Sequence, residues 1–431
     1  MPHSKPISLK DVFQLWLPLA GSWLLMGMES PVLAAFVARM VSPEITLATW
    51  GSLVYPISLV VEGPIIMLLT ASTALAKDLS AYRKLFKYML YMSLALSLIH
   101  ILIAFTPLFF FVAEDLMNVP KSLLVPGKIG LQIMTPWTLM IAWRRLNQGV
   151  MIKHGNSNMV AIGTSIRLIA LVLVLSYGKW FTSFSGIIVG SSAVAIAVTA
   201  EAIYAQLAVR RILREMSKRS TESIQITRKT FTKFYLPLAI TPLASLLIHP
   251  VGAAGMSRMP EALPSLAAWP VVYGLVFITR SLGFAFNEVV VALLPRPNGK
   301  LALLRFTRIL AVSTSAFLAL LALTPLGSYW FLYVSGLSKD LAYLSSTTLI
   351  FAVLMPGYQA YQAWYSGLLV NENQTNGISY AVLVYAAIAI IGLWIGAYFA
   401  TFPGIFWAVN VFVFAGLSQT LYLRYSYKKI G

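Results

Sequence analysis

Cysteine is absent from the 431 residues, and histidine and charged residues are scarce. Without cysteine the chain forms no disulfides, thiolate metal sites or thiol nucleophiles. The four histidines are scattered and contain no H-x-x-x-H pair, so the sequence predicts no metal site. The G-x-x-x-x-G-K-[ST], G-x-S-x-G and H-E-x-x-H motifs are missing too. We therefore expect neither a P-loop ATP-driven pump nor an enzyme, and we expect no catalytic residues and no cofactor.

Apolar residues dominate what is present. Hydrophobic residues make up 58% of the chain and charged residues 11%, and the mean hydropathy is +0.78. Soluble domains carry roughly 25% charged residues. The net charge of +18 would otherwise suggest a nucleic-acid partner, but most basic residues lie in short loops between apolar stretches, as they do in membrane proteins. These features predict an all-α polytopic membrane protein that lies in the lipid bilayer and binds no nucleic acid.

Long apolar windows give the number of membrane spans. A helix needs roughly 20 apolar residues to cross the bilayer. The first apolar run is too long for a cleaved signal peptide, so we predict a transmembrane helix there. The windows predict twelve spans, at 12–41, 45–71, 85–112, 127–152, 158–177, 184–208, 233–258, 264–294, 301–334, 341–370, 377–400 and 404–425.

The basic residues are distributed unequally between the two sides of these spans. The two termini and the even-to-odd loops carry 22 lysines and arginines, whereas the opposite side carries 5. Basic loops stay on the cytoplasmic side. The distribution therefore predicts a plasma (inner) membrane protein with both termini in the cytoplasm. We expect it to be a monomer.

Two stretches of the sequence repeat each other. Residues 17–50 and 236–269 match at 14 of 34 positions with a constant offset of 219, including Pro18/Pro237 and Trp50/Trp269. A weaker similarity continues at an offset of 218. The division predicts an N-terminal six-helix lobe (1–208), a basic cytoplasmic linker (209–232) and a C-terminal six-helix lobe (233–431). Parallel repeats of this kind build two-lobed transporters that work by alternating access.

Two glutamates lie close before prolines inside predicted spans. Glu29 precedes Pro31, and Glu62 precedes Pro64. Proline interrupts the helical hydrogen bonds and would leave the carbonyls of residues 27 and 60 free. A carboxylate beside free carbonyls suits a coupling H⁺ or Na⁺. The alternative is a structural carboxylate held by hydrogen bonds or an ion pair.

Arg280 lies near the middle of the eighth span, one residue from the repeat counterpart of Glu62. Arginine stays protonated and offers paired donors to a carboxylate or a phosphate. Arg280 therefore either attracts a small-molecule anionic substrate or forms an ion pair with Glu29 or Glu62. The two roles are compatible, because a substrate anion could compete for the arginine.

A second group of charges lies in the cytoplasmic half of the N-terminal lobe. Arg144, Arg145 and Arg167 face a single acid, Glu201. This excess of cations favours exposure of some of them to a substrate cavity, and the alternative is that an arginine reaches the cytoplasmic interface. On a helix, Arg144 and Gln148 share one stripe and Arg145 points about 100° away.

Three further polar residues are candidates. His249 replaces Ser30 in the repeat and either titrates during transport or serves a structural role. Asn287 and Glu288 in the eighth span either form part of the substrate and ion-coupling sites or lie at the interface near the basic loop at 296–300.

Four stretches of the sequence stand out: LPLAGSWLLMGMESPVLAAFVARM, LATWGSLVYPISLVVEGPIIMLLTASTAL, GVMIKHGNSN and GFAFNEVVVALLP. They resemble the MATE-like, or MOP flippase, superfamily, and within it the progressive ankylosis (ANK) family and its bacterial relatives. Glu29 and Glu288 fall where that family also carries acids, whereas the pair Arg144/Arg145 departs from its animal members. The resemblance implies an antiporter that exports small organic anions of the citrate, nucleotide or pyrophosphate kind.

Other functions remain open at this point. Glu29 and Glu62 suit an H⁺- or Na⁺-coupled multidrug exporter of the MATE type, although the four intramembrane arginines argue against a cationic cargo. An arginine-rich cavity also suits a flippase for a lipid-linked pyrophosphate such as lipid II. A membrane enzyme would need a polar catalytic cluster at one membrane face, which the sequence does not contain.

Overall fold

The computed structural model describes residues 6–218, 226–372, 374–399 and 401–429. Helices and turns account for these residues, and none of them lies in a strand, which confirms the predicted all-α class. The chain forms two compact units. The first unit contains Met1–Arg39 and Gly255–Gly431, and the second unit contains Met40–Ala254.

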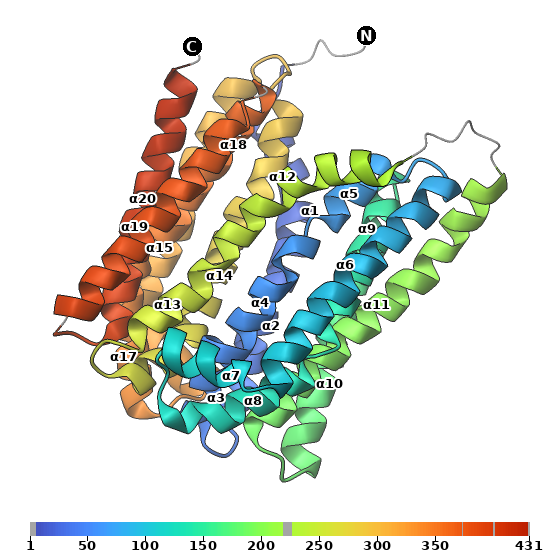
Figure 1. The fold of residues 1–431 in the computed structure, drawn as a ribbon. Coiled ribbons are helices and arrows are strands. Elements are labelled where there is room, and N and C mark those ends of the chain that lie inside the picture. Colours follow the sequence, from blue (N-terminus) through green and yellow to red (C-terminus); the bar gives the residue numbers. More distant parts are fainter. Residues whose placement is uncertain (1–5, 219–225, 373, 400, 430–431) are drawn as a thin grey trace. The chain divides into compact units, whose positions relative to one another are not determined.

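The second unit is built around α9. This helix packs against α5, α6, α10 and α11 (Figure 1). The helical elements of the unit are α3 (Pro43–Thr49), η1 (Trp50–Val54), α4 (Tyr55–Glu62), η2 (Gly63–Ile65), α5 (Leu68–Leu75), α6 (Leu79–Phe105), α7 (Leu108–Phe110), η3 (Phe111–Leu116), η4 (Lys121–Leu123), α8 (Leu124–Ile133), α9 (Trp137–Lys153), α10 (Ser157–Phe181), α11 (Gly186–Lys218), α12 (Arg228–Leu246) and most of α13 (Ile248–Met256).

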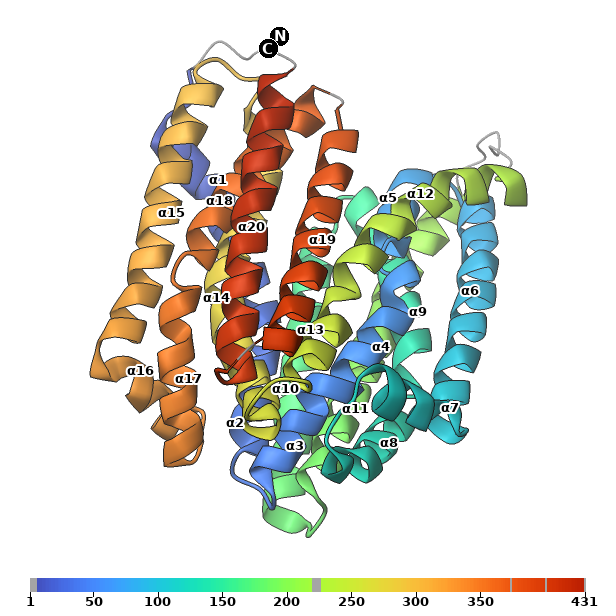
Figure 2. The ribbon, with the colours of Figure 1, turned by 60° about the vertical axis from the view of Figure 1, so that its left-hand side comes forward.

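The first unit is built around α14 and α18. Helix α18 lies between α15 and α20, and α14 packs on α1, α17 and α18 (Figure 2). A cluster of buried side chains that includes Phe286, Phe306 and Trp364 joins α14, α15 and α18. The elements are α1 (Leu9–Gly27), α2 (Glu29–Val37), α14 (Ala262–Leu293), α15 (Gly299–Leu323), α16 (Pro325–Tyr329), η5 (Trp330–Val334), α17 (Lys339–Ala352), α18 (Met355–Asn371), α19 (Asn376–Phe399) and α20 (Gly404–Lys428).

Ten helical stretches among the described residues are long and apolar enough to cross a membrane. They match ten of the twelve predicted spans. The fourth predicted span corresponds to α8 and α9, whose polar residues lower its hydropathy, and the seventh corresponds to α12 and α13. Helices such as α10 and α19 turn large apolar side chains outward, including Leu173 and Trp394. Such surfaces need a hydrocarbon environment, so the chain is an integral membrane protein.

The helices break where the two Glu–x–Pro sequences occur. Helix α1 ends at Gly27 and α2 begins at Glu29, while α4 ends at Glu62 and the tight turn η2 follows. The predicted interruptions are thus confirmed. The predicted free carbonyl at position 60 is wrong, because the carbonyl of Val60 accepts a hydrogen bond from the backbone N–H of Gly63. A tightened last turn satisfies the carbonyl that the proline would leave open.

The compact units do not follow the basic linker. Helix α12 comes after the linker but packs in the second unit, where the Tyr235 hydroxyl donates to the Pro64 carbonyl at 2.6 Å and Phe231 stacks on Tyr88 at 4.7 Å. Helices α1 and α2 pack on α14 in the first unit. The division into lobes at 209–232 describes the sequence repeat and stays a prediction.

Close packing of α5 against α9 fixes the helix that carries the arginine pair. A Cβ atom at Gly149 would collide with Ser72 and Leu69, so glycine permits the approach. The Thr73 hydroxyl donates to the Gly149 carbonyl at 3.2 Å, and Lys153 Nζ donates to the Thr73 carbonyl at 2.9 Å. These contacts hold α9 in register with the end of α5.

Candidate functional site

The sequence candidates fall into both units. The second unit contains the candidates Glu62, Arg144, Arg145, Arg167 and His249, and the first unit contains Glu29, Arg280, Asn287 and Glu288. Each unit therefore has its own cationic centre, one built on α9 and the other on α14.

Glu201 organises the cationic centre of the second unit. Arg144 donates from Nη1 to Glu201 Oε2 at 2.6 Å, and Gln148 donates from Nε2 to Oε1 at 3.0 Å. Arg167 Nη1 lies 3.7 Å from the same Oε2. Arg144 and Glu201 are buried. The predicted common stripe of Arg144 and Gln148 is confirmed, because both side chains reach one carboxylate on α11.

A chain of neutral hydrogen bonds continues from this network along α9. The Tyr82 hydroxyl donates to Asn147 Oδ1 at 3.0 Å, and Asn147 Nδ2 donates to Gln206 Oε1 at 3.0 Å. Trp143 Nε1 donates to the same Gln206 oxygen at 2.6 Å. These bonds join α6, α9 and α11 and leave the Glu201 network little freedom to rearrange.

Arg145 is not part of the Glu201 network. It lies near enough to Glu62, at the end of α4, for the two charges to interact. Glu62 is 5% exposed, and its Oε2 and the Arg145 Nε have no hydrogen-bond partner among the described residues. Glu62 thus adds a second acid to the three arginines. The surplus of cationic side chains is one and not the two expected from Glu201 alone.

Arg280 is the cationic centre of the first unit. Its Nη2 donates to Gln359 Oε1 at 2.8 Å, and its guanidinium lies over the rings of Phe284 at 5.6 Å and Tyr358 at 5.8 Å. No carboxylate in the described part of this unit forms an ion pair with it, so the expected pairing with Glu29 is not found. The arginine is instead surrounded by an amide and by aromatic faces.

The remaining sequence candidates are Glu29, Asn287, Glu288 and His249. Glu29 begins α2, where a carboxylate is favoured by the helix dipole, and it has interaction partners of its own. Asn287 and Glu288 lie two turns beyond Arg280 on α14, and Glu288 is exposed. His249 is half-buried on α13 and has interaction partners.

Sequence reasoning missed Gln359 and Tyr358, which contact Arg280 from α18. A repeat signal could have drawn attention to this helix. At an offset of 218, Arg144 corresponds to Gln362 and Glu201 to Gln419. Gln362 Nε2 donates to Gln419 Oε1 at 3.1 Å, which is the amide equivalent of the ion pair in the second unit.

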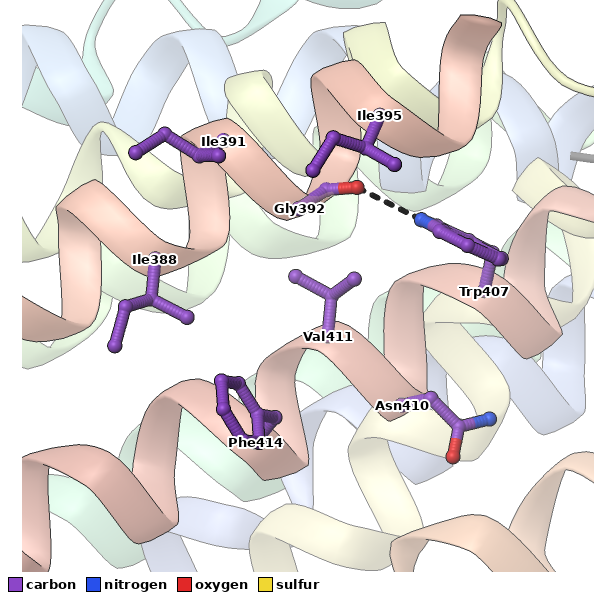
Figure 3. Close-up of a pocket in the computed structure, with 8 residues that line it drawn as sticks. All are labelled: Ile388, Ile391, Gly392, Ile395, Trp407, Asn410, Val411 and Phe414. Atoms are coloured by element: carbon purple, nitrogen blue, oxygen red, sulfur yellow. Dashed lines mark hydrogen bonds between the residues drawn. The ribbon is translucent and has the colours of Figure 1, made fainter. Parts of the chain in front are cut away.

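A separate hollow lies between α19 and α20 (Figure 3). Its volume is about 420 Å³, and its lining is apolar except for Asn410 and the Trp407 indole, which donates to the Gly392 carbonyl at 2.8 Å. Val411 and Phe414 face into it (Figure 3). The lining offers contact to a hydrocarbon chain but gives an anion no charged partner, so we place the candidate site at the arginines.

No family model and no curated protein matches the sequence. Solved structures match over nearly the whole chain. An inward-facing multidrug resistance transporter of the MATE family matches with a TM-score of 0.67 and 14% identity, covering 98% of this chain and 96% of that one. The lipid II flippase MurJ in an inward closed conformation matches with a TM-score of 0.72 and 15% identity, covering 96% and 87%.

A third match is distinguished by the polarity of its binding pocket. It is a MOP superfamily transporter from Pyrococcus furiosus, described as having a pocket of reversed polarity that suggests a different function. Its TM-score is 0.61 at 12% identity, and the match covers 98% of this chain and 96% of that one. The chain therefore has the fold of the MATE and MOP transporters, whereas the resemblance to the progressive ankylosis family stays a prediction.

Proposed function

We propose that the chain is a secondary active transporter that exports small organic anions by alternating access between two lobes. The observation that carries this proposal is the environment of Arg280, a guanidinium in the middle of a membrane-spanning helix. An amide and two rings surround it, and no carboxylate among the described residues of its unit forms an ion pair with it. Citrate-like, nucleotide-like or pyrophosphate-like cargo fits such a centre.

The physical reason is the cost of an uncompensated charge in the membrane. An arginine at the centre of a bilayer helix costs at least about 2.5 kcal/mol unless it meets water or an opposite charge. One hydrogen bond to Gln359 and two cation–π contacts offset only part of this cost. A bound carboxylate or phosphate would complete the site, since it accepts paired donors from one guanidinium.

The second unit supplies the coupling site and further substrate contacts in this proposal. Glu62 would take up the coupling H⁺ or Na⁺, and Glu29 and Glu288 of the first unit are the other candidate acids. Arg145 would attract the anion towards Glu62. Arg144 and Arg167 share Glu201. They would therefore keep the electrostatic potential around the site positive and would not bind the cargo directly.

A lipid-linked pyrophosphate flippase is the second candidate. The likeness to the lipid II flippase favours it, and paired arginines suit a pyrophosphate. A cation-coupled multidrug exporter has equal support from the fold, but its cationic cargo would meet four buried or half-buried arginines. Monomeric state, inner-membrane location, cytoplasmic termini and outward transport belong to the proposal as well, as does the absence of a cofactor and of enzymatic activity.

The test is citrate flux in proteoliposomes with an imposed H⁺ or Na⁺ gradient. Arg280→Gln should lower the flux about a hundredfold, since truncating one partner of a buried charge pair costs roughly 2–5 kcal/mol. Arg308→Gln, an exposed position on α15, is the matched control and should transport normally. Unchanged flux in Arg280→Gln at normal expression would remove the arginine from the site. Movement of a cationic dye with no anion flux would favour the drug exporter instead.

A further inference from the structure

One face of α14 combines Arg280 with aromatic rings. Tyr273, Phe277, Arg280 and Phe284 follow one another at spacings of four, three and four residues, which places them on a single stripe of the helix. All four are half-buried, whereas most of the other residues between 265 and 290 are buried. This aromatic stripe is therefore less buried than the residues around it in the middle of α14.

The rings of the aromatic stripe form a continuous surface. The centroids of Tyr273 and Phe277 are 6.0 Å apart, and those of Phe277 and Phe284 are 5.9 Å apart. Trp23 on α1 extends this surface, because it stacks on Phe284 at 5.4 Å with an interplanar angle of 29°. Such spacings are typical of interacting aromatic pairs.

This surface is larger than Arg280 needs for its own stabilisation. The guanidinium already lies over Phe284 and Tyr358, and either ring alone would provide a cation–π contact. The stripe nevertheless continues for seven residues from Arg280 to Tyr273, which is roughly 10 Å along a helix axis. Rings at that distance contribute little to holding the arginine, but they would lie beside a ligand that projects from it.

The fold itself does not require these rings. At the repeat offset of 219, Phe277 corresponds to Ser58 and Phe284 to Ile65 in the second unit. Phe277 is also near the middle of α14, far from the helix ends where aromatic residues usually anchor a protein in the membrane interface. The rings are thus a special property of the face that carries Arg280.

We infer that the transported anion is aromatic: a planar ring that bears a carboxylate or a phosphate, with the acidic group on Arg280 and the ring against Phe277 and Tyr273. This inference rests on the proposed function and narrows its substrate class. It separates aryl acids and aryl phosphates from aliphatic polycarboxylates such as citrate, which would use the guanidinium but could not stack on the rings.

The test compares phenyl phosphate with cyclohexyl phosphate, which has the same charge and a similar size but no π system. Proteoliposomes holding the full-length protein should transport phenyl phosphate about tenfold more efficiently, in line with the strength of ring stacking. Phe277→Leu and Phe284→Leu should each lower the ratio of phenyl phosphate to cyclohexyl phosphate transport towards one. Transport of cyclohexyl phosphate should persist in both variants. Phe317→Leu, at a 52%-exposed position on α15, is the control and should keep the preference.

The outcomes separate the inference of an aromatic substrate from the proposed function of anion transport on which it rests. Equal transport of the two phosphates, or a preference that survives both phenylalanine variants, would overturn the aromatic assignment and leave an anion transporter. Transport of neither phosphate nor citrate, in protein that elutes as a single species in detergent, would overturn both. A phenyl preference that Arg280→Gln abolishes together with flux would support both.

Discussion

The same pair of positions is charged in one unit and neutral in the other. In the second unit Arg144 donates to Glu201 at 2.6 Å between α9 and α11, and in the first unit Gln362 donates to Gln419 at 3.1 Å between α18 and α20. The two pairs are related by an offset of 218 residues. Two amides therefore satisfy this contact as well as an ion pair does, so the fold does not explain the charges.

The polarity of a neighbouring position is reversed between the units. At the offset of 219, Arg280 lies one residue from the counterpart of Glu62. Glu62 lies in the field of Arg145 and Arg144, whereas Arg280 lies among Gln359, Tyr358 and Phe284. One unit thus holds an acid near arginines, and the other holds an arginine near neutral groups. This division suits a protein that binds a cation in one unit and an anion in the other.

The largest expected effect is on the Glu201 network. Glu201→Gln removes the carboxylate that Arg144 and Arg167 share, and breaking a buried pair in this way costs about 3–5 kcal/mol. We expect the thermal midpoint in detergent to fall by many degrees. The double variant Arg144→Gln/Glu201→Gln recreates the amide pair of the first unit and should recover most of the loss. If the double variant is as unstable as the single one, the two contacts are not equivalent.

Glu62 should affect coupling more than stability. Glu62→Gln removes the carboxylate that would bind H⁺ or Na⁺ in the coupling step. The amide keeps the size of the side chain. We expect anion flux to continue at a reduced rate and to lose its dependence on the imposed gradient. Flux at a series of gradients in proteoliposomes measures this, with the exposed Glu215→Gln as the control. Full gradient dependence in Glu62→Gln would mean that coupling lies elsewhere, with Glu29 next to be tested.

Gln359 should position Arg280. Gln359→Leu removes the 2.8 Å hydrogen bond to the guanidinium, and a bond to a charged group contributes roughly 1.5–3 kcal/mol. We expect the KM for the anion to rise about tenfold with a smaller change in the maximal rate, because the arginine remains but is less well oriented. Asn410→Leu on α20 replaces an exposed amide and should leave the KM unchanged. A wild-type KM in Gln359→Leu would show that the two rings alone hold the guanidinium.

Local sequence patterns predicted those features of the site that lie within one helix. Proline spacing located the interruptions near Glu29 and Glu62, and helical periodicity separated Arg145 from the stripe of Arg144 and Gln148. The pairing of helices was not accessible in the same way. Gln359 is 79 residues from Arg280 in the chain, and a neutral glutamine in an apolar span carries no local signal of its partner.

The grouping of helices into units also went beyond the sequence. The repeat and the basic linker indicated a boundary near 209–232, but α1 packs on α14 and α12 packs on α4 and η2. Hydrophobic periodicity identifies a buried face without specifying which helix covers it. Contacts between residues far apart in the chain decide which unit a helix joins. The hydrogen bond from Tyr235 to Pro64, for example, links residues 171 positions apart.

The smallest expected effect concerns the neutral pair. Gln419→Leu removes the acceptor on α20, but Gln362 Nε2 also donates to the Gly416 carbonyl at 3.0 Å and keeps that bond. The loss should therefore be about 1 kcal/mol, the usual net contribution of a single hydrogen bond. A thermal midpoint close to that of the wild type, measured beside Glu201→Gln in the same detergent, would show that charge and not position makes the second unit sensitive. An equally large fall in both variants would instead make the contact between the two helices essential to each unit, whatever its polarity.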